Sequence, residues 1–178
     1  MKKLTVLTIL AIAMTMMISS AAAAQTATGT LTVTATVNSS INLVFNSDAA
    51  GVALSSGAGT NNATLAFGNV SAFGAVAAGI TRTTTATTFT VSTPVDVLVT
   101  KANSASANYT LKAQLGAADA VNTWQVGGTT VTNAAAATIT ATGTYASNVA
   151  EAIALTIPFT TANATAISNT INFTATAN

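Results

Sequence analysis

The chain has 178 residues, of which only 5% are charged, and it contains neither histidine nor cysteine. Without these side chains it cannot build Ser–His or Cys–His nucleophiles, thiol redox centres or zinc sites with nitrogen and sulfur ligands. Five basic and four acidic residues leave a formal charge of +1, which provides no basic surface for nucleic acid.

The first 24 residues have the three regions of a secretory signal peptide. Lys2 and Lys3 form a positive start, residues 4–18 are apolar, and small residues lead to a cleavage site before Gln25. An uncleaved membrane anchor is the alternative, but the apolar run is shorter than the roughly 20 residues of a spanning helix. We therefore expect cleavage after residue 24. The mature chain would be exported to the periplasm, the cell surface or the medium, without a transmembrane span.

Removing 24 of the 178 residues leaves 154, which suits one domain. The mature chain begins with a strictly alternating segment. Within residues 25–37 four apolar side chains alternate with threonines, and these are Leu31, Val33, Ala35 and Val37. A period of two predicts a strand with one apolar face. Residues 41–45 continue as a second short strand or as the same strand after a bulge. Residues 46–62 are rich in Gly, Ser and Asn and predict a long loop, and residues 63–68 predict another short strand.

The longest strand signal runs from Phe89 to Leu115, on both sides of a polar loop at residues 103–108. Apolar residues alternate with polar ones in both arms, as in Val95, Val97 and Val99 and then Tyr109, Leu111, Ala113 and Leu115. This pattern predicts a half-buried antiparallel pair that a second sheet must cover. Pro94 cannot donate a ladder hydrogen bond, so we expect it at a strand start or on an edge.

The C-terminal third predicts a small hairpin at residues 124–131 on a Gly-Gly turn, and a strand at 138–145. A further strand from Glu151 places Ile153, Leu155, Ile157 and Phe159 on one face. The closing strand places Ile171, Phe173 and Ala175 on one face. Roughly nine or ten short strands with regular turn signals predict an all-β fold, an Ig-like Greek-key β-sandwich formed by residues 38–178.

The mature chain carries three basic residues, Arg82, Lys101 and Lys112, against four acids, Asp48, Asp96, Asp119 and Glu151. The acids are far apart in sequence, so we expect no carboxylate pair of the kind that glycoside hydrolysis needs. Asp96 and Glu151 stand at polar positions of strands, and we expect both to face solvent. Residues 46–48 resemble a fragment of a calcium loop but lack its further acidic ligands. We expect no metal, no cofactor and no catalytic residue, and hence no enzyme.

With the strands placed, the order of features resembles the spore coat protein U domain, a family that includes the pilins of archaic chaperone–usher pili. The matching parts are the TLTVTATVNSSI start after the signal peptide, the strand end at residues 65–68, the STPVDV segment at 92–97, the NYTLKAQL arm with Trp124 downstream, and the closing SNTINFTATAN strand. Many members carry a cysteine pair, which this chain lacks.

The resemblance implies an Ig-like sandwich that lacks one strand, which the N-terminal extension of a neighbouring subunit supplies. Residues 25–37 would be this donor, with Leu31, Val33, Ala35 and Val37 filling pockets between the sheets. The partners implied are further subunits of a pilus-type assembly and a periplasmic chaperone. The residues alone leave open that 25–37 is the first strand of a complete domain.

Two functions follow from the sequence. The first is an exported structural or adhesive surface protein, pilin-like, that assembles by β-strand addition. The second is a secreted carbohydrate-binding β-sandwich module, in which Trp124 or Tyr145 stacks on a sugar, although aromatics more often fill a sandwich core.

Overall fold

The computed structural model describes residues 28–178, so the expected signal peptide lies outside the described residues. This part of the chain contains β-strands and no helix, and it therefore has no helix that could span a membrane. The strands are β1 (Ser40–Ser47), β2 (Thr81–Thr84), β3 (Thr88–Ala102), β4 (Asn108–Leu115), β5 (Thr123–Val126), β6 (Thr129–Val131), β7 (Ala137–Thr144), β8 (Asn148–Pro158) and β9 (Ile171–Ala177).

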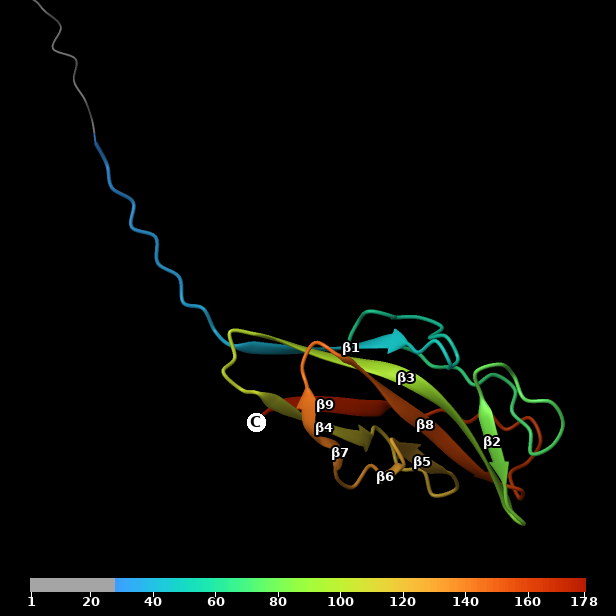
Figure 1. Cartoon of the computed structure of the whole chain (residues 1–178). Coiled ribbons are helices and arrows are strands. Elements are labelled where there is room, and N and C mark those ends of the chain that lie inside the picture. Colours follow the sequence, from blue (N-terminus) through green and yellow to red (C-terminus); the bar gives the residue numbers. More distant parts are fainter. Residues whose placement is uncertain (1–27) are drawn as a thin grey trace, which may run out of the picture. The chain divides into compact units, whose positions relative to one another are not determined.

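The chain divides into two units, Met1–Thr36 and Val37–Asn178, and all the strands belong to the second. They form two antiparallel sheets that pack face to face as a β-sandwich (Figure 1). The larger sheet has the order β1-β3-β8-β5-β6, with β2 paired to β3, and the smaller sheet has the order β7-β4-β9. The predicted all-β sandwich is confirmed.

The two sides of the sandwich differ. β1 and β9 each pair with a single strand, and they meet at one side, where the rings of Phe45 and Phe173 lie edge to face at 5.2 Å. At the opposite side β6 lies beside β7, and the Leu115 amide at the end of β4 donates to the Thr132 carbonyl just after β6, at 3.0 Å. We call these the β1/β9 side and the β6/β7 side.

The prediction that the arms of residues 89–115 form one antiparallel pair is wrong. β3 pairs with β1, β2 and β8, whereas β4 pairs with β7 and β9 in the other sheet. The two arms face each other across the core, where Val97, Val99, Tyr109 and Leu111 form a buried cluster. Alternation specifies an inward face but no hydrogen-bonding partner. The connection from residue 103 to residue 107 is long enough to cross the roughly 10 Å between sheets.

Pro94 lies in the middle of β3, not at the expected start or edge. The β1 ladder pairs with β3 only from Val95 onward, and the β2 ladder only as far as Ser92. Pro94 therefore faces a gap between these ladders, and Gly51 approaches its carbonyl oxygen so closely that a Cβ there would overlap it. The N and O of one residue in an antiparallel strand point to the same side, so the missing N–H removes no bond to β8.

The short strand predicted at residues 63–68 is a loop in the structure. Residues 63–68 make only an isolated bridge, between Ser56 and Thr64, within a connection that runs from β1 to β2. The Gly127–Gly128 hairpin is confirmed: both glycines have positive φ, 55° and 79°, as a tight two-residue β-turn requires.

Candidate functional site

The alternating N-terminal segment makes no strand in the described part of the chain. Residues 28–39 have no regular structure, and residues 25–27 lie outside the described range. The predicted pocket-filling side chains are exposed: Leu31 is 88% exposed, Val33 80% and Val37 72%, and Ala35 is exposed too. An apolar face of this regularity exposed to water is unfavourable, which suggests a missing partner.

Burial in the sandwich falls off toward the β1/β9 side. The inner residues of the central strands are almost fully buried, as shown by Val97 and Val99 of β3 and by Leu111 and Ala113 of β4. The inner residues of the edge strands are only partly buried, and these are Ile41, Leu43 and Phe45 of β1 and Ile171, Phe173 and Ala175 of β9. The predicted common face of the closing strand is thus present, but nothing in the described chain covers it completely.

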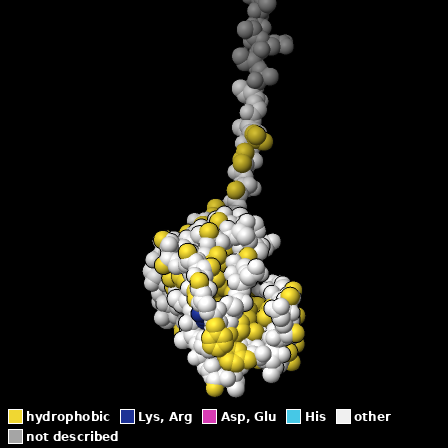
Figure 2. Space-filling view, turned by 90° about the vertical axis from the view of Figure 1, so that its right-hand side faces the viewer, with side chains coloured by type: hydrophobic (Ala, Val, Ile, Leu, Met, Phe, Trp, Pro, Cys, Tyr) yellow, Lys and Arg dark blue, Asp and Glu magenta, His cyan; other side chains and the backbone are white. Residues whose placement is uncertain are grey.

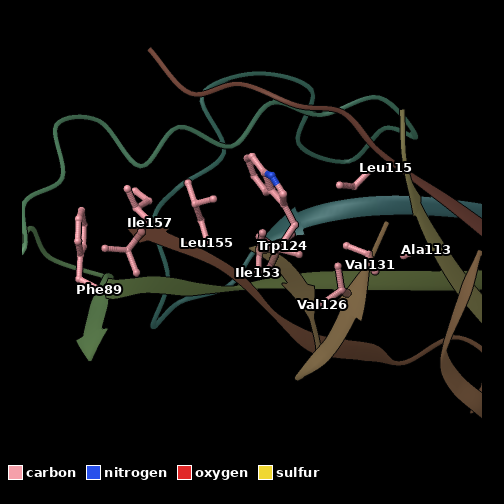
Figure 3. Packing of buried hydrophobic residues seen from close by; sticks show 11 residues of the cluster. Phe89, Ala113, Leu115, Trp124, Val126, Val131, Ile153, Leu155 and Ile157 are labelled. Carbon is pink, nitrogen blue, oxygen red and sulfur yellow. The ribbon is translucent and has the colours of Figure 1, made fainter. Parts of the chain in front are cut away.

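A groove of about 1550 Å³ lies along this side. Inner-face side chains of the larger sheet form its floor, and Figure 3 shows Phe89, Leu155 and Ile157 projecting from that sheet in one direction, together with Trp124. Residues 61–72 and 161–170 form its walls, together with residues of β1 and β9. Figure 2 shows a hollow surrounded by apolar side chains on the face at the right-hand side of Figure 1, with almost no charged groups.

Two exposed aromatic rings, Phe73 and Phe159, lie beside one end of the groove. Phe159 lines the groove, stacks on Phe89 at 6.3 Å and contacts the exposed Phe73 at 5.9 Å. The Arg82 guanidinium supports this end, because it donates to the carbonyls of Ser71 and Gly74 at 2.8 and 2.7 Å. No periodic signal marks Phe73, which belongs to a loop.

Trp124 is a core residue that also lines the groove. It is 7% exposed, and its indole Nε1 donates to Asp119 Oδ2 at 2.8 Å. Burial raises the pKa of Asp119, but hydrogen bonds from Asn122, Trp124 and the Val121 amide outweigh it and lower the pKa to about 2. Asp119 therefore remains ionised and fixes the indole, which presents no open face for a sugar.

Tyr145, the other candidate ligand aromatic, lies in a different cluster from Trp124. Its hydroxyl donates to the Asn108 carbonyl at 3.1 Å, its ring packs on Tyr109 at 5.3 Å, and the Lys101 ammonium lies 4.9 Å from its centroid. The structure does not bring the two aromatics together into one binding surface.

The expectation that Asp96 and Glu151 face solvent was wrong for Glu151. The charge of Asp48 acts on Asp96, because the β1–β3 register places the end of β1 beside Asp96, whose carboxylate accepts a hydrogen bond from the Asn148 side-chain amide at 3.3 Å. Burial, and then the charge of Asp48, raise the pKa of Asp96. Glu151 does not face solvent: it is 5% exposed. Glu151 lies two residues before Ile153, in the same alternating series as Leu155 and Ile157. The sequence alternation therefore already indicated that Glu151 faces inward.

No protein-family model, curated protein or solved structure matches this chain in the three comparisons. The groove, the two edge strands and the N-terminal segment are the features of this chain that indicate a function.

Proposed function

We propose that this chain is an exported, pilin-like structural subunit that assembles on the cell surface by β-strand addition. Residues 25–37 of one copy would enter the groove of another and pair with the free edge of β9, completing an Ig-like sandwich. The observation that carries the proposal is the match within one chain between an exposed alternating segment and a groove bordered by two incompletely covered edge strands. An open edge accepts a strand through its backbone, and pockets accept alternate side chains.

The register of β1 favours a second copy as the source of the strand. If the segment turned back on its own β1 through Asn38 and Ser39, Val37 would pair with Ser40 and Thr36 with Ile41. Opposed residues in an antiparallel ladder share a face, so the threonines would enter the core and the apolar residues would face water. A three-residue turn at 37–39 would pair Ala35 with Ile41 and Val33 with Leu43, but it would remove Val37 from the apolar face, whereas a strand supplied by a second copy keeps all four apolar side chains available.

The decisive experiment compares two double variants of mature residues 25–178. Leu31→Asp with Val33→Asp places charges on the apolar face, and Thr32→Asp with Thr34→Asp places the same charges on the other face. Light scattering coupled to size exclusion, over a range of concentrations, should show polymers for the wild type and the threonine variant. The apolar-face variant should remain monomeric, because a carboxylate is too costly to bury in the groove. Equal assembly of both variants would refute the proposal.

A deletion separates a donor strand from an ordinary first strand. Without residues 25–37, the remaining chain should be a folded monomer that binds a peptide of residues 25–37. It should not bind a peptide in which Leu31, Val33 and Val37 are replaced by threonine. If the deleted chain unfolds and the full mature chain is always monomeric, the segment is an internal strand. Glycan screening with Trp124→Ala would then test the carbohydrate-binding alternative. Intact mass of the exported protein, expected to begin at Gln25, checks export and cleavage.

A further inference from the structure

Glu151 is the one buried acidic side chain among the described residues. It projects from the inner face of β8 into the sandwich, between the apolar residues Val149 and Ile153 of the same face. A carboxylate in such surroundings loses most of its hydration, so its charge is costly unless partners compensate for it.

The contacts of the carboxyl group join three parts of the β6/β7 side. Thr140 of β7 donates its hydroxyl to Oε1 at 3.2 Å. The turn between β5 and β6 lies against Oε2, so closely that a Cβ on Gly127 would overlap it and would also lie 3.3 Å from the Ile139 methyl. The Gly127 amide in turn donates to the Ala152 carbonyl of β8 at 2.9 Å. Glu151 therefore sits where β8, the β5–β6 turn and β7 meet.

β7 is irregular at this place. Its register with β4 shifts between Tyr109 and Leu111 and again between Leu111 and Lys112. Consecutive residues Ile139 and Thr140 are both partly buried, which a regular strand with alternating faces does not produce. Bulges re-aim side chains, and this one directs a hydroxyl to the buried carboxyl group. The irregular register of β7 thus brings the Thr140 hydroxyl to Glu151, and the absence of a side chain at Gly127 leaves room for its carboxyl group.

Within residues 28–178, no cation faces the Glu151 carboxyl group. Lys101 donates to the Ser106 carbonyl, Arg82 holds the 71–74 loop, and Lys112 is exposed on β4. The titratable neighbour is Tyr109 on β4, whose pKa is raised by burial, then by the negative charge of Glu151 and by Tyr145. Burial raises the pKa of Glu151, and the Thr140 hydroxyl offsets part of this rise.

We propose that Glu151 is a proton-controlled latch: in its neutral form it holds the β5–β6 turn against β7, and ionisation loosens this side of the sandwich. The direction follows from linkage. The folded chain binds this proton more tightly than the unfolded chain, whose carboxyl has the ordinary pKa of 4.5. The contribution to stability is complete below that value and is lost as the pH rises through the higher pKa of the folded state. The subunit would be most firmly closed in acid, whether or not it polymerises.

The test measures the free energy of unfolding of mature wild type and Glu151→Gln by urea, between about pH 4.5 and about pH 8. Wild-type stability should fall with rising pH, and the glutamine variant should lose most of this fall. Asp96→Asn is the matched control, because Asp96 also has a raised pKa but lies on the outer face; it should retain most of the fall. Parallel profiles for wild type and Glu151→Gln would overturn the proposal.

Two further measurements test whether the pH effect arises at the contacts of Glu151. Thr140→Val removes the hydrogen bond that lowers the pKa of Glu151, so the fall should extend to higher pH; an unchanged profile contradicts the latch. Hydrogen exchange at the Gly127 amide, corrected for its intrinsic pH dependence, should lose protection between about pH 5 and about pH 8 in wild type but not in Glu151→Gln. Equal loss of protection in both proteins would also contradict it.

Discussion

The ring of Tyr109 lies directly on Gly143, its partner across the β4–β7 ladder. A Cβ on Gly143 would overlap the Cζ and both Cε atoms of the ring. Both residues are buried, and the ring continues on to Tyr145 at 5.3 Å. A residue without a side chain is therefore what allows an aromatic residue to lie flat at this point of the smaller sheet.

Gly143→Ala should consequently destabilise the sandwich by about 1–3 kcal/mol, because the added methyl forces the Tyr109 ring or the β7 backbone to shift. Urea unfolding measures the change. Thr144→Ala, at the neighbouring exposed position of β7, is the control and should stay within about 0.5 kcal/mol of wild type. A Gly143→Ala protein as stable as the control would show that the ring has room to move.

Asp119→Ala should loosen the environment of Trp124. It removes the acceptor of the indole N–H and of the Val121 and Asn122 amides, and we expect a loss of about 1–3 kcal/mol in stability. The chain has a single tryptophan, so its fluorescence reports on this site alone. Unchanged emission and unchanged stability in the variant would contradict the assigned role of the carboxylate.

The ionisation of Asp119 should make stability depend on pH in the opposite direction to that of Glu151. The pKa of Asp119 is lowered from 3.8 to about 2, so its contribution to stability is present above 3.8 and is lost as the pH falls through about 2. Acid titration followed by tryptophan fluorescence should show this loss in wild type. Asp119→Asn should not show it, and a persistent transition in that variant would assign it to another group.

The acceptor side of the proposed assembly can be blocked without touching the donor. Ile171→Trp places a larger side chain into the groove from β9, and Thr174→Trp places the same side chain on the outer face of the same strand. Light scattering should show reduced polymer for the first variant and wild-type behaviour for the second. Polymers of equal size in both would mean that the groove does not receive the strand.

Arg82→Lys should release the loop at residues 69–79. Lysine cannot reproduce the forked contact with the Ser71 and Gly74 carbonyls, and the loop has no strand of its own. Limited proteolysis should cut this loop faster in the variant, while global stability changes by about 1 kcal/mol or less because the site is exposed. Cleavage at the wild-type rate would show that the loop is held by other contacts.

Some of the fold can be read from local alternation. The hairpin at Gly127–Gly128, the inward face of Ile171 and Phe173, and the all-β class follow from residues close together in sequence, because a strand presents alternate side chains to one face. The same rule identifies Glu151 as an inward residue, and the solvent-facing expectation failed because residue type was given more weight than parity.

The sequence by itself determined which side chains of each strand share a face. It also determined that the chain has few charged residues and neither histidine nor cysteine. Only the tertiary structure decided that β3 and β4 belong to different sheets, that Asp48 meets Asp96, and that β1 and β9 border an incompletely covered groove. These are matters of pairing and register between distant segments. A period of two constrains the faces of a strand but leaves its partners free, so long-range packing has to select them.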